Sequence, residues 1–210
     1  MQRRLTENER RAMVALYEGR FKDHGVDIRT VGWPSQEQQR QRFKVLLRDV
    51  EVRGKSVLDV GCGFGDLVPF LEQIAGDDFR YVGIDIVPQL VAAGAAKYGA
   101  RNRAFRTGDF LGMSDLERFD IVVMSGALNF RIADNLHYAH TMLRRLHDLS
   151  VEVTSVNFLS SYVDFQNPLH FHYVPEDMFR FARSLTRWVT LIHDYPLWEF
   201  TLQLRHEPKS

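Results

Sequence analysis

Three glycines at alternate positions follow a short apolar run that carries a single acid, Asp59. They are Gly61, Gly63 and Gly65, and the only cysteine of the chain, Cys62, lies between the first two. Glycine adopts positive φ at little cost and has no Cβ, so such a loop lets the main chain approach a ligand closely. The pattern therefore predicts a ligand cradle made of backbone, with small side chains inside it.

The residues on either side of the glycines indicate which elements hold this loop. Residues 56–60 are too few for a helix and rich in β-branched side chains, so they are predicted to form a buried strand. Beyond the loop, apolar residues recur at the i, i+3, i+4 and i+7 spacing of a helix, at Leu67, Phe70, Leu71 and Ile74. Strand, glycine loop and helix together are the opening unit of a nucleotide-binding α/β domain.

The details of the loop decide between kinds of nucleotide. A dinucleotide-binding loop needs a third glycine where this chain has Asp66, and a P-loop needs Gly-Lys-Ser/Thr, which this chain lacks. The stretch Val-Leu-Asp-Val-Gly-Cys-Gly-Phe-Gly at residues 57–65 resembles the first motif of class I S-adenosylmethionine (SAM)-dependent methyltransferases. SAM contains no phosphate, so an acid beside the loop is acceptable. The resemblance implies that the cofactor is bound by Asp59, Gly61, Cys62, Gly63 and Gly65.

The next two strands are predicted to end at acids, and ligands of open α/β sheets bind beyond such carboxyl ends. Asp85 follows Gly65 by 20 residues, where a carboxylate can accept hydrogen bonds from both vicinal ribose hydroxyls. Ile86 is expected to pack on the adenine. By the resemblance, Asp109 accepts from the adenine amine, and Phe110 covers the ring or donates its backbone amide. Alternatively, Asp109 is only the N-cap of a following helical turn.

The fourth strand is predicted to end before Ser125, where a methyl acceptor meets the sulfonium in this family. We assign Ser125 to cofactor binding and Asn129 to orienting the cofactor amine or the substrate, although Asn129 equally suits a turn. Residues 125–128 read Ser-Gly-Ala-Leu, whereas enzymes that methylate exocyclic amines of bases resemble one another in an Asn/Asp-Pro-Pro-aromatic motif here. Together with a net charge of zero, this argues against nucleic acid as the substrate.

A long predicted loop after the fifth strand supplies aromatic and imidazole candidates. Tyr162, Phe165 and Tyr173 either form an apolar cage that faces the sulfonium by cation–π attraction or simply pack the loop. Tyr173 and Asn129 are our two catalytic candidates. His170 and His172 are candidates for a base or a substrate contact, and a metal site there would need a third ligand.

The carboxylate of the methionine half of SAM needs a cationic partner, which the glycine loop does not supply. Arg42 directly precedes Phe43, a member of the apolar stripe of a predicted helix, so we expect its guanidinium at the edge between core and solvent. An edge position suits a carboxylate clamp, and a solvent-facing arginine is the alternative.

Composition bounds the class of protein. Hydrophobic residues make up 45% and charged residues 26% of 210 residues, as in ordinary globular domains. A single cysteine excludes an internal disulfide and a cysteine-cluster metal site. No run of 18 apolar residues and no signal peptide is evident, so we expect a cytoplasmic protein without membrane partners.

The alternation of patterns predicts a Rossmann-like seven-stranded α/β fold, mostly parallel with an antiparallel last strand, behind an N-terminal helical cap. The cap is assigned to residues 1–53, a compact cofactor domain to 54–206 and a tail to 207–210. Predicted strands are 56–60, 80–85, 103–107, 119–124, 150–157, 188–193 and 197–205. Predicted helices are 66–75, 88–98, 134–148 and 175–184, after two in the cap that begin at Thr6 and Ser35. The last strand alternates apolar and polar residues, so we expect it to be half exposed.

These observations favour methylation of a small molecule at the expense of SAM. A second hypothesis is a SAM cyclase similar to azetidine-2-carboxylate synthases, in which the α-amine attacks the γ-carbon of SAM and expels methylthioadenosine. A third is a SAM-binding protein without catalysis. The sequence leaves the acceptor and the oligomeric state open.

Overall fold

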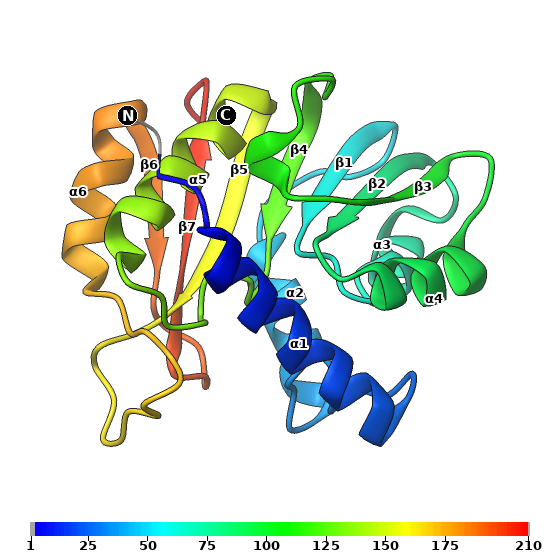
Figure 1. Ribbon diagram of the computed structural model, residues 1–210. Helices are drawn as coiled ribbons and strands as arrows, with labels where there is room; N and C mark the ends of the chain where they lie inside the picture. Colours follow the sequence, from blue (N-terminus) through cyan, green and yellow to red (C-terminus); the bar gives the residue numbers. More distant parts are fainter. Residues whose placement is uncertain (1–2, 210) are drawn as a thin grey trace.

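The computed structural model describes residues 3–209, so the first two residues of the predicted cap and the last residue of the predicted tail lie outside it. A single seven-stranded sheet runs through the molecule in the order β3-β2-β1-β4-β5-β7-β6 (Figure 1). Its strands are β1 (Lys55–Val60), β2 (Phe79–Asp85), β3 (Arg103–Thr107), β4 (Phe119–Met124), β5 (Ser150–Leu159), β6 (Trp188–Ile192) and β7 (Glu199–Arg205). The helices are α1 (Glu7–His24), α2 (Gln36–Leu46), α3 (Val68–Ala75), α4 (Pro88–Tyr98), α5 (Asn135–Leu149), α6 (Pro175–Leu185) and the short 3-10 turn η1 (Phe110–Gly112).

The predicted Rossmann-like architecture is confirmed, and no predicted boundary after the cap differs by more than two residues from the observed one. The pairs among β3, β2, β1, β4 and β5 are parallel, and β7 is antiparallel to both of its neighbours. Strand order reverses between β1 and β4, which creates the crevice where ligands bind in such sheets. The division into a cap and a cofactor domain stays a prediction.

Two apolar cores cover the two faces of the sheet, because successive strand residues point to opposite sides. Leu58 of β1 and Val122 of β4 belong to the core beneath α5 and α6. Their chain neighbours Val57 and Ile121 belong to the core beneath α2 and α3. All four are fully buried, and each contributes about 1.5–3 kcal/mol of transfer free energy. This double burial holds the carboxyl ends of β1 and β4 rigidly side by side.

The prediction that the last strand is half exposed is wrong, because β7 lies inside the sheet between β5 and β6. Its polar residues Glu199, Thr201 and Gln203 are buried and partnered. Gln203 donates from Nε2 to the carbonyls of Leu46 (3.2 Å) and Arg48 (2.9 Å), and Thr201 shares a hydrogen bond with Tyr195 (3.0 Å). An alternating pattern shows that the two faces of a strand differ in polarity. Here the polar face packs against the end of α2 and the residues that follow it, instead of facing water.

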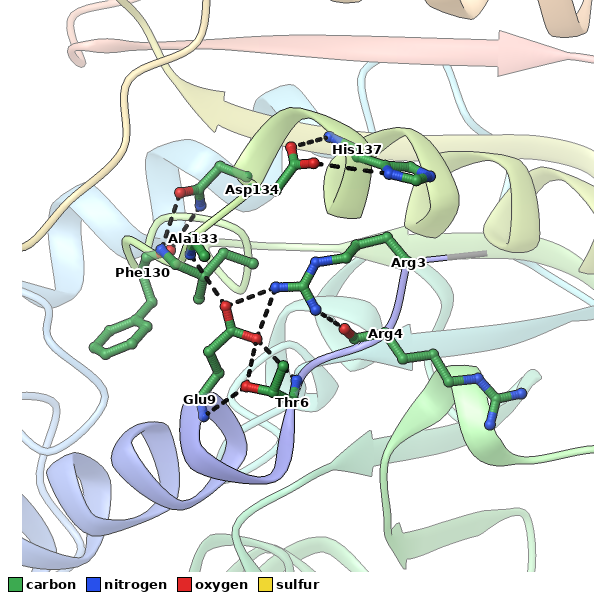
Figure 2. A network of polar contacts seen from close by, with 10 residues as sticks. Arg3, Arg4, Thr6, Glu9, Phe130, Ala133, Asp134 and His137 are labelled. Atoms are coloured by element: carbon green, nitrogen blue, oxygen red, sulfur yellow. Dashed lines mark hydrogen bonds and ion pairs between the residues drawn. The ribbon is translucent and has the colours of Figure 1, made fainter. Parts of the chain in front are cut away.

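The first helix is tied to the loop that follows β4. As predicted, Thr6 and Glu9 form a capping box at its start. Glu9 also accepts from the N–H of Ala133 (3.0 Å) and pairs with Arg3 (2.6 Å), as Figure 2 shows. Partial burial raises the pKa of Glu9, but these bonds and those from Thr6 outweigh burial and lower it to about 2. The tie therefore holds α1 against the carboxyl end of β4 at neutral pH.

The second helix begins at Ser35, whose side chain accepts from the N–H of Gln38 (3.2 Å), as the sequence predicts. Phe43 and Leu46 bury its apolar face against the sheet. Among residues 3–209, no helix is long and apolar enough to cross a membrane.

Candidate active site

A cavity of about 370 Å³ lies beyond the carboxyl ends of β1, β2 and β4, in the size range of small-molecule sites. Its floor includes the glycine loop and the segments that follow β2, β3 and β4. Both N-terminal helices line it, α1 through Met13, Leu16, Tyr17 and Arg20, and α2 through Gln38, Gln39, Arg42 and Phe43. Both helices therefore border the cavity, and α2 also packs against β5 and β7.

The glycine loop has the backbone that its sequence predicts. Gly61, Gly63 and Gly65 have φ of 76°, 54° and 75°, a region that side chains with a Cβ rarely adopt. A Cβ on Gly63 would lie 3.0 Å from Val31 of the connection between α1 and α2. Cys62 is buried, and burial raises the pKa of its thiol, so it stays protonated and unreactive. The loop is thus a close-packed wall of the cavity.

Asp85 lines the cavity and braces this wall. One carboxylate oxygen accepts from the N–H of Gly63 (2.9 Å) and the other from that of Val87 (2.9 Å). Burial raises the pKa of Asp85, and the backbone N–H groups act against this. A carboxylate has about four lone-pair positions, so two of them are left for ribose hydroxyls. The predicted ribose contact is compatible with this geometry.

Two further acids approach the cavity from β1 and from the end of β3. Asp59 is buried and accepts from the hydroxyl of Tyr81 (2.9 Å), and its pKa is raised to about 7, chiefly by burial. Asp109 lines the cavity and accepts from the N–H of Leu111 (3.2 Å), so it is also the N-cap of η1. Ile86 and Phe110 lie beside it in the lining, where the adenine is expected.

The segment after β4 contributes polar atoms that have no partner. Ser125 Oγ and Asn129 Oδ1 are buried and form no hydrogen bond with the described residues. Each orphaned atom costs about 1–3 kcal/mol, so a bound molecule that completes these bonds is favoured. Between them, Gly126 donates its N–H to Asn157 Oδ1 (2.9 Å), which fixes this segment to β5.

Arg42 does not occupy the edge position that we expected. It is 2% exposed, forms an ion pair with Glu199 at the start of β7, and stacks 3.3 Å from the centre of the Trp33 ring. The expectation is wrong because α2 lies flat on β5 and β7, so the residue beside Phe43 also faces the sheet. Burial lowers the pKa of Arg42, yet its ordinary value is so high that the guanidinium stays charged.

The guanidinium of Arg42 nevertheless reaches the cavity. Its Nε and Nη1 are buried without partners, and a Cβ on Gly126 would lie 2.9 Å from Nη1 and 3.9 Å from Asn129 Nδ2. Arg42 and Asn129 therefore converge over the end of β4. Sequence reasoning missed Glu199, because it placed this acid on the exposed face of the last strand.

Tyr173 does not lie at the cavity. It is fully buried, donates its hydroxyl to the carbonyl of Leu128 (2.9 Å), and packs on Phe158. Tyr162 and Phe165 are 59% and 78% exposed and are absent from the cavity lining, so the three rings form no cage. Tyr162 instead donates its hydroxyl to Glu176 of α6 (2.6 Å), and Tyr173 supports the segment after β4 through its bond to Leu128. His170 lines the cavity, whereas His172 does not.

Comparison with known proteins places the chain in a family. Residues 57–149 match the model of a methyltransferase domain. A Mycobacterium tuberculosis protein, Rv1506c, which is named as a methyltransferase, is 34% identical over 158 residues that cover 71% of this chain and 92% of that protein. This chain belongs to the class I SAM-dependent methyltransferase superfamily.

Solved structures agree on the fold of this methyltransferase. DhpI in complex with S-adenosylhomocysteine (SAH) superposes with a TM-score of 0.72 at 16% identity, covering 98% of this chain and all of the other (100%). Magnesium protoporphyrin IX methyltransferase from Synechocystis PCC 6803 with bound SAH gives 0.66 at 16% identity, covering 93% and 95%. Membership of the superfamily, shown by the sequence relatives, makes SAM the cofactor of this methyltransferase.

The charges of the cavity suit this cofactor. SAM carries a sulfonium and an ammonium group, and Asp59, Asp66, Asp85 and Asp109 all line the cavity. Such a cluster of carboxylates attracts a cation and repels the phosphates of other nucleotides. The unpartnered donors of Arg42 offer a complement for the cofactor carboxylate at the other end. The residues present thus fit SAM.

Proposed function

We propose that this methyltransferase transfers the methyl group of SAM to a small molecule. The observation that carries the proposal is a cavity of about 370 Å³ that is lined by α1, α2 and the segment after β4, a size that suits a small molecule. The net charge of zero supports it, since a nucleic-acid substrate favours a basic surface. Two structural neighbours are associated with small molecules: one is named as a magnesium protoporphyrin IX methyltransferase, and the other, DhpI, is solved in a complex with SAM and HEP.

When bound, SAM supplies a methyl group attached to a positively charged sulfur. A lone pair of the acceptor forms the new bond to the methyl carbon while the carbon–sulfur bond breaks, and SAH and the methylated acceptor leave. The chain contributes by holding both reactants in line and by excluding water, which needs no specific base if the acceptor is already nucleophilic.

The residues divide this work. The acids of the floor hold the adenosine and the cationic groups of the cofactor, and Arg42 binds its carboxylate through Nη1. Asn129 offers an acceptor atom, Oδ1, to the cofactor amine or to the N–H or O–H of the acceptor. Ser125 completes the hydrogen bonds of the methionine half.

Incubation with SAM alone and with SAM plus a fractionated small-molecule extract, followed by mass spectrometry, tests the proposal. We expect SAM to stay intact alone and to yield SAH and a methylated compound with the extract. Methylthioadenosine with a four-membered imino acid from SAM alone would instead establish a cyclase. Intact SAM under both conditions would indicate binding without catalysis.

A further inference from the structure

Arg20 faces the cavity from the same side of α1 as Met13, Leu16 and Tyr17, since these residues follow the i, i+3, i+4, i+7 spacing of one helix face. Its guanidinium lies 5.5 Å from the centre of the Tyr17 ring, and its Nη1 lies 2.8 Å from where a Cβ on Gly32 would be. Neither contact neutralises its charge, and no carboxylate of residues 3–209 forms an ion pair with it.

The other basic residues around this end of the cavity add no net charge. The guanidinium of Arg42 is balanced by Glu199. His170 lies across the cavity on the loop after β5, and both burial and, secondarily, the charge of Arg20 lower the pKa of its imidazole, which stays neutral near pH 7. Arg20 is therefore the one uncompensated cation that we find beside the acceptor end within the described chain.

The lining on the side of His170 is apolar, and Phe130 forms a β-bridge with His170, on which the charge of Arg20 acts. Phe130 follows β4, Leu159 ends β5, and Leu197 and Trp198 precede β7, and all four line the cavity. Trp198 is also 65% exposed, so it lies at the mouth and is reached from solvent. These side chains would cover an aromatic or aliphatic body without offering it hydrogen bonds.

We propose that the acceptor is a carboxylic acid with an aromatic or aliphatic body and a separate hydroxyl that receives the methyl group, bound with its carboxylate at Arg20 and its body against Phe130, Leu159 and Trp198. A single uncompensated guanidinium matches one negative charge, and its planar donors match a carboxylate. A dianionic phosphate would find only half of its charge balanced. The inference rests on the proposed methylation of a small molecule and names the class of that molecule.

Calorimetric titration of the SAH-bound protein with benzoate and with its uncharged isostere benzamide tests the subsite. SAH fills the cofactor site, so the probe reports on the acceptor end. We expect benzoate to bind at least tenfold more tightly than benzamide. Arg20→Gln should reduce the affinity for benzoate to that for benzamide while the affinity for SAH is unchanged. Arg11→Gln is the matched control on the same helix, because Arg11 is 67% exposed and outside the cavity lining.

Equal binding of benzoate and benzamide, or equal binding of benzoate by wild type and Arg20→Gln, would overturn the acid subsite. A second arm uses SAM with a deuterated methyl group and the small-molecule extract. We expect the labelled product to be retained on an anion-exchange column, and a neutral or cationic product would overturn the inference. If no product is labelled, the proposed methylation fails, whereas the benzoate titration still decides whether the carboxylate subsite exists.

Discussion

Arg42 carries a buried charge whose environment bears on stability and on the proposed binding of the SAM carboxylate. Glu199 neutralises it, Trp33 covers its face, and Asn157 donates to the second oxygen of Glu199 (2.7 Å) and accepts from Gly126. One connected network thus runs from α2 through β7 and β5 to the segment after β4. Removing one partner of such a buried pair typically costs 3–5 kcal/mol, because the other charge is left uncompensated.

Arg42→Lys keeps the charge beside Glu199 but removes the planar donors that face the cavity. We expect SAM affinity to fall at least tenfold, since a hydrogen bond to a charged group is worth about 1.5–3 kcal/mol. Decarboxylated SAM should bind both proteins alike in a calorimetric titration. Arg40→Lys, on the outer face of the same helix, is the control that should bind SAM normally. Equal losses for both ligands would mean that Arg42 only holds α2 in place.

Asp85→Ala removes the expected ribose acceptor and also the brace between Gly63 and Val87. SAM should therefore bind at least tenfold more weakly, with the fold retained by circular dichroism. Asp115→Ala, which removes an exposed acid that pairs with Arg106, should leave the affinity unchanged. An Asp85→Ala protein with wild-type affinity for SAM would contradict the ribose assignment.

At the scale of elements, three connections meet over the end of β1. The glycine loop, the segment after β4 and the connection between α1 and α2 touch one another through Val31, Trp33 and Gly126. Because Glu9 ties the start of α1 to Ala133, the cover of the cavity and its floor are mechanically linked. Strain introduced into the glycine loop should therefore weaken the binding of SAM.

Gly63→Val tests this contact. Its φ of 54° disfavours a branched residue, and the new side chain would press on Val31, 3.0 Å from the Cβ position. We expect a folded, less stable protein with no detectable SAM binding. Gly54→Val is the matched control, with a φ of 74° but open space around its Cβ position and no place in the cavity lining. It should lose stability while binding SAM, and loss of binding there would mean that strain alone abolishes it.

On the scale of the whole molecule, buried titratable groups at opposite parts of the sheet respond to pH in opposite directions. His147 of α5 stacks on His206 with the ring centres 4.1 Å apart, away from the cavity. Its pKa is lowered to about 4, first by burial and then by the charge of His206. Asp59 at the cavity has its pKa raised to about 7, chiefly by burial.

The two shifts have opposite consequences for folding. Neutral His147 is favoured by the fold, so its contribution is present above pH 6.5 and is lost as pH falls toward 4. Protonated Asp59 is favoured by the fold, so its contribution is present below pH 3.8 and is lost as pH rises toward 7. In the wild-type pH profile these two contributions add to those of the other shifted groups, among them Glu9 and Asp27.

His147→Phe should expose this balance. It removes the histidine contribution. Between pH 6.5 and pH 4, the free energy of unfolding measured with urea should therefore fall by roughly 2–3 kcal/mol less for His147→Phe than for wild type. His137→Gln, on the exposed face of the same helix, should keep the wild-type profile. A His147→Phe profile parallel to that of wild type would show that His147 does not titrate in this range.

The sequence by itself determines the elements and the identity of the cofactor. Hydrophobic periodicity and glycine spacing are local, so strand β1, the glycine loop and the acid at the end of β2 can be read from neighbouring residues. Chain order in a parallel sheet then brings Asp85, Asp109 and Ser125, which lie at or follow the carboxyl ends of their strands, to one edge of the sheet. The cavity lining contains all three.

Only the tertiary structure decides which distant residues meet. Glu199 is 157 residues from Arg42, and their pairing depends on the insertion of β7 between β5 and β6 and on the docking of α2 across it. Arg20 and Tyr173 are both near predicted helices, yet one faces the cavity and the other the core. The physical reason is that periodicity specifies which face of an element is buried. Strand order and helix docking specify which residues that face contacts, and both depend on the packing of the whole chain.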